Sequence, residues 1–284
     1  MIYIKKLFFI FIIVILVVGL SGVSVYLIDM FDQDILTTSS SQISSTTNTI
    51  SSSSSDSITT TTTVVNTIDN SLLTKMSLAN VMVTTVYKTC DELDNCTVWT
   101  SEQGSGTIYK IRDKTCVVNT CIAPIYYVIT NFHVISDPEY SSISTDVITS
   151  ITMFDGTTYQ ATYDAGNPEY DLALLSFSRS QKIGQSIDFL TERNPVPGDE
   201  VLTIGCPGGV YNTVTQGEFD RFSAIDSYWY DLILHSAILS PGSSGGALYS
   251  STGQFLGINS FSNENGYYSI PWYVVNNFLA SVSS

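Results

Sequence analysis

Three short segments of the chain carry side chains that together could support nucleophilic catalysis. His133 follows an apolar segment, Asp171 immediately precedes another, and three candidate serines, Ser240, Ser243 and Ser244, lie in or beside the glycine-rich turn PGSSGG at 241–246. A serine hydroxyl becomes an effective nucleophile when a histidine accepts its proton, and an aspartate can fix the imidazole tautomer and stabilise the imidazolium. The order histidine, aspartate and serine, each at the edge of a β segment, therefore indicates acyl transfer by an activated serine.

Each of these residues alone has an ordinary structural explanation. A single histidine near a strand end is usually structural, an aspartate before a strand usually belongs to a turn, and serines are abundant in this chain. We interpret His235, in DLILHSAIL, as a strand residue rather than a second base. Cys206, in IGCPGG, is interpreted as a buried small apolar side chain rather than a nucleophile. Only the combination favours a catalytic site.

The part of the chain that must position these side chains is rich in short β segments. Val, Ile, Thr and Tyr recur between Gly, Pro, Asn and Asp, which predicts an all-β sandwich or barrel architecture over roughly 210 residues. NPVPGD at 194–199 divides this part into two halves, and a helix is expected over 271–282, where Pro271 suits the first turn. The expected strands are 80–88, 106–111, 126–130, 150–154, 158–163, 172–177, 200–205 and 254–261.

The first 28 residues have the composition of a membrane-spanning segment. An almost unbroken apolar run of about 22 residues extends from Leu7 to Ile28, long enough as a helix to cross a hydrocarbon core roughly 30 Å thick. Lysines precede the run and aspartates follow it, which predicts a cytoplasmic N-terminus and an exported remainder. A cleaved signal peptide and a secreted product are the alternative. We favour a retained anchor, because the run exceeds the usual apolar core of about 7–15 residues.

A Ser/Thr-rich segment separates the apolar run from the β-rich part. About 70% of the positions from Thr37 to Thr67 are Ser or Thr, and such a composition cannot bury enough apolar surface to offset chain entropy. A disordered tether is expected, either a plain spacer or an O-glycosylated stalk. The predicted organisation is an anchor at 1–28, a linker at 29–71 and a folded domain at 72–284, with halves at about 72–193 and 194–284.

Charge and cysteine content restrict the partners and the kind of site. A net charge of −15 would repel a phosphate backbone, so nucleic acid is not an expected partner. The chain holds only two histidines and no cysteine spacing typical of a zinc ribbon, so neither a metal nor a cofactor is expected. Cys90 with Cys96 and Cys116 with Cys121 are candidate disulfides in an exported protein. Four cysteines permit three pairings, however, and spacing does not choose among them.

Six short motifs of the chain are similar to those of a known protein family. They are TNFHVI (130–135), DLALL (171–175), IGCPGG (204–209), SPGSSGGALY (240–249), GQFLGINSF (253–261) and SIPWYVVNNFL (269–279). With these motifs the chain resembles the trypsin-like (chymotrypsin-fold) serine proteases, in particular the HtrA/DegP-like branch, over nearly all of 78–282. The resemblance implies two six-stranded antiparallel β-barrels with an active site in the cleft between them. It also implies a triad of His133, Asp171 and Ser244, with the N–H groups of Gly242 and Ser244 forming the oxyanion hole.

Two departures from the digestive members of this family bear on regulation. Ser243 stands where those enzymes carry the aspartate that pairs with a new N-terminus, so activation by N-terminal cleavage is not expected. Val134 stands where they carry a cysteine, so the disulfide beside the histidine is missing.

The 40 residues after Ser244 leave no room for the PDZ domains of the HtrA-like branch, so gating by such a domain is not expected.

The resemblance also implies a primary substrate pocket. None of its expected side chains is acidic, and a buried unpaired cation would be costly, so an apolar substrate side chain is favoured over Arg or Lys. The expected lining residues are Ile238, Leu239, Asn259, Ser260 and Phe261.

The sequence therefore predicts a membrane-tethered serine endopeptidase that acts outside the cytoplasm on exposed or unfolded polypeptides. A role in protein quality control is implied by the resemblance alone. The alternative is a catalytically inactive β-barrel that a stalk displays as a binding or adhesion module. The sequence does not indicate an oligomeric state.

Overall fold

The computed structural model describes residues 68–93, 95–117, 120–187 and 194–282. These residues belong to one compact unit, Val64–Ser284. The expected membrane anchor and nearly all of the expected linker lie outside the described residues. Within the described ranges, no helix has the length and apolar character needed to cross a membrane.

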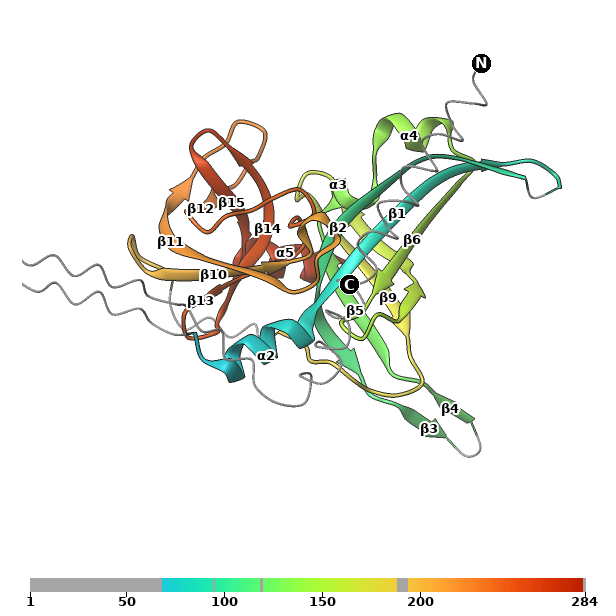
Figure 1. The fold of residues 1–284 in the computed structure, drawn as a ribbon, viewed down its shortest axis with the longest axis horizontal. Coiled ribbons are helices and arrows are strands. Elements are labelled where there is room, and N and C mark those ends of the chain that lie inside the picture. Colours follow the sequence, from blue (N-terminus) through green and yellow to red (C-terminus); the bar gives the residue numbers. More distant parts are fainter. Residues whose placement is uncertain (1–67, 94, 118–119, 188–193, 283–284) are drawn as a thin grey trace, which may run out of the picture. The chain divides into compact units, whose positions relative to one another are not determined.

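The second half of the described chain forms a closed, antiparallel, six-stranded barrel in the order β10-β11-β12-β15-β14-β13 (Figure 1). This confirms the barrel expected for that half. Its strands are β10 (Glu200–Gly205), β11 (Thr213–Ser223), β12 (Leu232–His235), β13 (Ala247–Ser250), β14 (Phe255–Asn263) and β15 (Gly266–Pro271).

The first half forms a half-barrel instead of the expected six-stranded closed barrel. Its described strands build a seven-stranded sheet in the order β7-β6-β1-β2-β5-β9-β8. One bent segment supplies both edges, because 158–160 pairs with β6, Ala161 lies at the bend, and 162–167 pairs with β9. The strands are β1 (Asn80–Cys90), β2 (Cys96–Arg112), β5 (Ile125–Thr130), β6 (Asp146–Thr152), β7 (Thr158–Gln160), β8 (Thr162–Asn167) and β9 (Leu172–Ser178).

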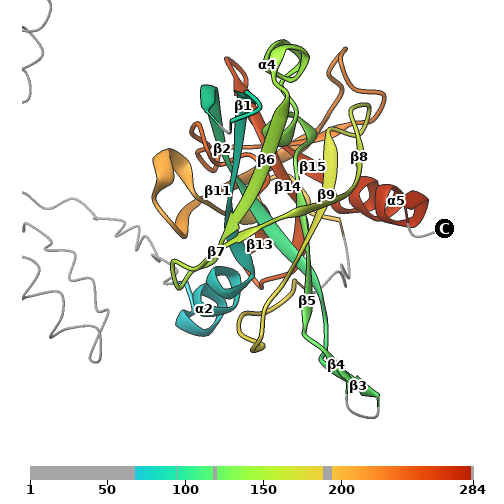
Figure 2. The same ribbon diagram turned by 90° about the vertical axis from the view of Figure 1, so that its right-hand side faces the viewer.

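Two disulfides join neighbouring strands at the ends of hairpins. Cys90 lies directly opposite Cys96 at the end of the β1–β2 hairpin, and the two are bonded. Cys116 lies opposite Cys121 and is bonded to it, in the small sheet of β3 (Thr115–Val117) and β4 (Thr120–Ile122), which extends away from the main sheet in Figures 1 and 2. Directly opposed residues of antiparallel strands are close enough to bond. Both candidate disulfides are thus confirmed.

Two longer helices flank the sheets. The expected C-terminal helix is present as α5 (Trp272–Val282), although Pro271 belongs to β15 rather than to the first helical turn. Helix α2 (Asn70–Ala79) was not expected, and it begins inside the range assigned to the linker. The Asp69 side chain accepts a hydrogen bond from the Ser71 N–H at 2.9 Å and so caps this helix. Two short helices, α3 (Phe132–Ile135) and α4 (Pro138–Ile143), follow β5.

A shared apolar core joins the half-barrel to the barrel. Ile129 of β5 and Leu172 of β9 are fully buried in the same cluster as Leu232 of β12 and Phe278 of α5. At about 25 cal/mol per Å² of buried apolar surface, such a cluster strongly favours a fixed arrangement of the two halves. Side chains of the half-barrel and of the barrel can therefore be held at fixed positions relative to one another where the two halves meet.

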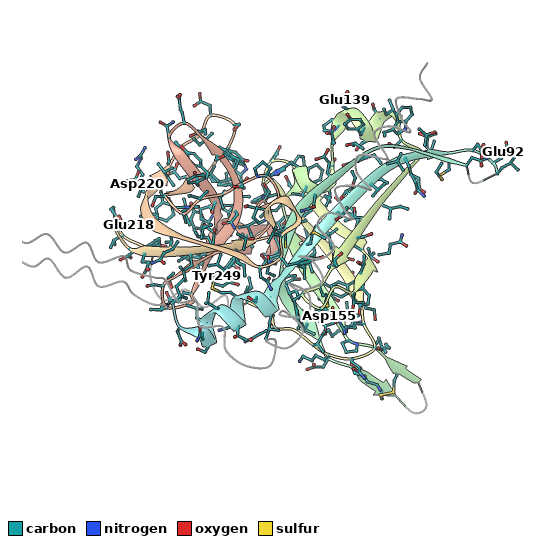
Figure 3. All side chains as sticks on the ribbon, in the orientation of Figure 1. Glu92, Glu139, Asp155, Glu218, Asp220 and Tyr249 are labelled. Atoms are coloured by element: carbon teal, nitrogen blue, oxygen red, sulfur yellow. A yellow bond between two sulfur atoms is a disulfide. The ribbon has the colours of Figure 1, made fainter. Side chains whose placement is uncertain are left out.

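Five acidic side chains labelled in Figure 3 lie on both halves of the domain, three on the first half and two on the second. Those labelled in Figure 3 are exposed, whereas Tyr249 is buried inside the barrel. The labelled acidic residues are Glu92, Glu139, Asp155, Glu218 and Asp220.

Candidate active site

His133 lies on α3, directly after β5, and is fixed by Asp171. Its backbone N–H donates to Asp171 Oδ1 at 3.1 Å, and its Nδ1 lies 3.0 Å from each carboxylate oxygen. A carboxylate only accepts hydrogen bonds, so Nδ1 carries the hydrogen and Nε2 is left as an acceptor. The histidine side chain is 50% exposed whereas that of Asp171 is 11% exposed, so solvent and ligands can reach the imidazole.

Asp171 lies in the turn between β8 and β9, in a backbone conformation that side chains rarely adopt. Its φ is +49°. A left-handed aspartate costs of order 1–3 kcal/mol and persists only where the surroundings hold it. The Asn131 amide donates to the Asp171 carbonyl at 3.0 Å, and the Ser260 hydroxyl donates to Oδ2 at 3.0 Å. The carboxylate is therefore held by groups from both halves of the domain.

Ser244 follows a tight turn with the features of type II. The Ser243 N–H donates to the Ser240 carbonyl at 2.8 Å, with Pro241 and Gly242 at the two central positions. Gly242 has a φ of +98°, which a type II turn requires at its third position and which glycine adopts without strain. The sequence therefore builds this turn locally.

A contact with the neighbouring loop orients one peptide group of the turn. The Pro241 carbonyl accepts a hydrogen bond at 3.0 Å from the N–H of Gly208, in the short 3₁₀ helix Pro207–Gly209. Because a trans peptide is planar, the N–H of Gly242 points away from that contact. Among the described residues, neither this N–H nor that of Ser244 has an acceptor. Two such groups on either side of Ser243 are suited to binding a negatively charged oxygen.

The Ser244 hydroxyl contacts Ser260. It donates to the Ser260 carbonyl at 2.6 Å, and no hydrogen bond joins it to His133 in the described part of the chain. Ser260 also donates to Asp171, so both expected catalytic partners of the histidine meet at this one residue. A serine hydroxyl changes direction by rotation between staggered χ1 positions, so a Ser244–His133 contact stays a prediction.

Ser105 of β2 holds the turn in place and was not among the residues expected from the sequence. Its N–H donates to the Ser244 carbonyl at 2.7 Å, and its hydroxyl donates to the Gly242 carbonyl at 2.6 Å. This close contact also explains Gly245, which has a φ of +88° and whose Cβ would lie 2.0 Å from the Ser105 carbonyl. The segment GSG at 104–106 was a visible signal, because glycines within a strand often mark a close backbone approach.

The structure divides the expected pocket residues into three groups. Ser260 and Phe261 line a cavity of about 350 Å³ that His133 also lines. Ile238, which is 55% exposed, and the buried Leu239 do not line this cavity. Asn259 is fully buried inside the barrel, where its amide donates to two backbone carbonyls.

The remaining walls of this cavity come from the connection between β11 and β12. They are formed by Ile225, Ser227 and Tyr228, none of which was expected. The aromatic run YWY at 228–230 was the available signal, since aromatic side chains outside a predicted strand are often recruited to pockets.

Cys206 is fully buried, as expected for a small apolar side chain. Burial raises the pKa of its thiol, while the Asn80 amide, 3.4 Å from Sγ, partly opposes this effect. Because the thiolate is the nucleophilic form, a raised pKa disfavours reactivity.

His235 is buried in β12, which confirms its interpretation as a strand residue. Its Nε2 lies 3.0 Å from the Ser269 hydroxyl. Burial lowers the pKa of His235 to about 4, from an ordinary value of 6.5. The histidine is therefore neutral in the folded protein at neutral pH and is not a second base.

This lowered pKa makes the free energy of unfolding depend on pH. The unfolded chain binds the proton first, so the contribution of His235 is fully present above pH 6.5 and is lost as the pH falls towards 4. We expect the loss to be about 3 kcal/mol in urea unfolding, and to be absent from a His235→Gln variant measured in parallel. Uptake of the His235 proton near pH 6.5 in a ¹⁵N-histidine titration of the folded protein would contradict this expectation.

The domain consists of a barrel and a half-barrel with a common core. The half-barrel carries a histidine–aspartate pair and the barrel carries a glycine-rich serine turn. Together these features define a trypsin-like β domain. A family model described as "Trypsin-like peptidase domain" matches residues 104–258, more than half of the chain. The chain belongs to this family. The matched range contains His133, Asp171 and Ser244.

Individual relatives are of the HtrA/DegP type, as the resemblance implied. "Serine endoprotease DegS" of Salmonella typhimurium is 32% identical over 139 residues, which are 48% of this chain and 36% of the relative. "Probable periplasmic serine endoprotease DegP-like" of Chlamydia pneumoniae is 31% identical over 167 residues, 56% of this chain and 32% of the relative. The matched part of the chain thus spans only about a third of the length of these curated relatives.

A solved structure has a similar fold. The serine endoprotease from Yersinia pestis superposes with a TM-score of 0.55 and 26% sequence identity, covering 75% of this chain and 65% of that chain. The likeness extends over both halves of the described domain, since either half alone is shorter than the covered share.

Proposed function

We propose that this protein is a serine endopeptidase that hydrolyses peptide bonds of exposed or unfolded polypeptides. The observation that carries the proposal is the meeting of Ser244 and Asp171 at Ser260, with His133 held by the same carboxylate. Ser244 is the nucleophile, His133 is the general base, and Asp171 orients the imidazole. The relatives named as serine endoproteases support this assignment.

The reaction begins when the Ser244 hydroxyl turns from the Ser260 carbonyl to Nε2 of His133. The imidazole takes the hydroxyl proton while Oγ forms a bond to the substrate carbonyl carbon, and the carbonyl π electrons move to the oxygen. Asp171 stabilises the imidazolium through Nδ1. The proton then passes from Nε2 to the leaving amine, the C–N bond breaks, and an ester of Ser244 remains. Water activated by His133 hydrolyses this ester and restores the enzyme.

The N–H groups of Gly242 and Ser244 would bind the negative charge that develops on the substrate oxygen. Both lack an acceptor among the described residues, and the Gly208 contact fixes the direction of one of them. Donors aligned in advance need no reorganisation during the reaction, and each contributes about 3–4 kcal/mol in comparable acyl-transfer sites.

The proposed site acts outside the cytoplasm. Two disulfides support an oxidising compartment, and one of the named relatives is described as periplasmic. In this proposal an anchor at 1–28 and a linker at 29–71 tether the domain to a membrane, and a role in protein quality control follows from the named relatives. The alternative of an inactive binding module has no observation in its favour.

A fluorophosphonate probe tests the proposed chemistry on the full chain. We expect one covalent adduct per molecule, located on Ser244 by mass spectrometry of proteolytic fragments, because only an activated serine attacks phosphorus quickly. The same chain unfolded in urea should not react. Absence of an adduct on the folded protein, or equal labelling of several serines, would contradict the proposal and favour the inactive module.

A further inference from the structure

An aromatic segment of the barrel packs against the turn that carries Asp171. This segment is the connection 224–231 between β11 and β12, the tyrosine loop, which contains Tyr228 and Tyr230. Tyr228 and Tyr230 of the loop both reach the Asp171 turn of the half-barrel. No step of the proposed mechanism uses them.

Tyr230 holds the backbone immediately before Asp171. Its hydroxyl donates to the Tyr170 carbonyl at 2.7 Å, and the side chain is buried. The Tyr170 ring lies within a cage of aromatic rings, with centroids 5.2 Å away for Trp229, 6.4 Å for Tyr230 and 6.0 Å for Phe278. Aromatic pairs at such separations contribute about 0.5–1.5 kcal/mol each beyond area burial. Tyr170 is thus fixed from the barrel side.

Tyr228 reaches the carboxylate itself. Its hydroxyl lies 3.4 Å from Asp171 Oδ2 and 3.5 Å from the Ser260 hydroxyl. Burial and the nearby Asp171 charge raise the pKa of Tyr228 to about 12, so the phenol keeps its proton and donates at neutral pH. Its ring stacks on Phe261, with centroids 5.8 Å apart and planes inclined by 8°, and it lines the cavity beside His133.

The conformation of Asp171 makes these contacts important. A residue at a φ of +49° returns to an ordinary backbone conformation unless several contacts oppose the change. The half-barrel contributes the Asn131 amide, the N–H and Nδ1 of His133 and the Pro168 carbonyl, and the barrel adds the hydroxyls of Ser260 and Tyr228. Loss of the barrel contacts would allow the carboxylate to move relative to Nδ1 of His133.

We propose that Tyr228 and Tyr230 are positioning residues that hold Asp171, and through it the His133 imidazole, in the geometry that hydrolysis requires. The inference rests on the proposed function. Tyr230 acts on the backbone at Tyr170, whereas Tyr228 acts on the carboxylate and also forms a wall of the cavity. The tyrosine loop thereby connects the substrate side of the barrel to the histidine–aspartate pair of the half-barrel.

Kinetics of single hydroxyl deletions test this role. We expect Tyr230→Phe and Tyr228→Phe each to lower kcat for a peptide substrate about tenfold, since small displacements of catalytic groups are costly. KM should stay within about twofold, because each ring remains in place. Tyr126→Phe is the matched control: its fully buried hydroxyl donates to the Ile183 carbonyl at 2.8 Å, and the expected kcat is that of the wild type.

Nuclear magnetic resonance gives a second measurement that does not depend on turnover. The chain has two histidines, so ¹⁵N-histidine labelling yields two imidazoles that a His235→Gln variant assigns. We expect the Nδ1 resonance of His133 to move in the two tyrosine-loop variants and to stay in place in Tyr126→Phe. The resonances of His235 should be unchanged in all three.

The two measurements separate the inference from the proposed function. Unchanged kcat and unchanged His133 resonances in both loop variants would overturn the inference, even if the enzyme is active. An equal loss of kcat in Tyr126→Phe would also overturn it, because a general loss of stability would then explain the effect. If Ser244→Ala hydrolyses peptides like the wild type, the proposed function fails, and displaced His133 resonances would still support the positioning role.

Discussion

Replacement of Ser244 by alanine is expected to lower kcat for peptide hydrolysis by about 10⁵–10⁶-fold. The substitution removes the oxygen that attacks the carbonyl, and the Ser260 and Asp171 side chains supply no substitute for it. KM should change little, because the hydroxyl makes no contact on which ground-state binding depends. The measurement is the initial rate of cleavage of a fluorogenic peptide by the full chain, with the melting temperature determined in parallel.

A matched substitution controls for the loss of a hydroxyl. Ser142→Ala, on the exposed α4 helix, removes a hydroxyl that donates to the Glu139 carbonyl at 2.8 Å within that helix, and should keep the wild-type rate. Ser244→Ala should retain residual hydrolysis of about 10³–10⁴-fold over water, because the backbone N–H groups of Gly242 and residue 244 are still present. A rate equal to that of the wild type would exclude Ser244 as the nucleophile.

Asp171→Asn is expected to lower kcat by about 10⁴-fold at neutral pH. The amide nitrogen is a donor, so an asparagine that faces Nδ1 favours the tautomer with its hydrogen on Nε2. That tautomer cannot accept the Ser244 proton. Asparagine tolerates the left-handed backbone as well as aspartate does, so the turn should stay folded and the loss should lie in kcat rather than in stability.

Asp155→Asn provides the comparison for removal of a carboxylate. Asp155 pairs with Arg179 at 2.9 Å in the half-barrel and contacts no residue of the site. Its neutral variant should keep the wild-type kcat. The chemical shifts of His133 should change in Asp171→Asn alone. Hydrolysis by Asp171→Asn within tenfold of the wild type would remove Asp171 from the proposed mechanism.

The proposed chemistry depends on the boundary between the two halves of the domain. His133 and Asp171 belong to the half-barrel, whereas Ser244, Ser260 and the tyrosine loop belong to the barrel. The shared apolar core holds these elements together. Changes that loosen this core should therefore affect catalysis before they unfold either half.

Local pattern was sufficient to predict several features. The β segments and the C-terminal helix follow from periodicity and turn residues, and β10 was predicted at its observed bounds. Four-residue strands such as β13 (ALYS) are too short and too uniformly buried to show an alternation, and this strand was missed. Cys90 and Cys96 pair because a hairpin connects them, so a short separation along the chain was informative.

The sequence by itself also determined which side chains could do chemistry. His133 and Asp171 stand out because each lies at the end of a β segment, the glycine-rich turn restricts the nucleophile to a few serines, and the family resemblance selects Ser244 among them. Such features depend on neighbours along the chain, so a single sequence contains the information. The half-barrel was harder to predict from the sequence. The segment 158–167 pairs with β6 before Ala161 and with β9 after it, and these pairings depend on strands that are distant along the chain.

Only the tertiary structure decided how these groups are held. Ser260 joins Ser244 to Asp171, Ser105 fastens the serine turn from a strand more than 130 residues earlier, and the tyrosine loop closes over the Asp171 turn. Asn259, one residue before Ser260, points instead into the barrel, where its amide donates to the Ile204 and Ala247 carbonyls. Contacts between residues far apart in the chain depend on how the two sheets pack, and that packing is a property of the whole apolar core rather than of any short motif.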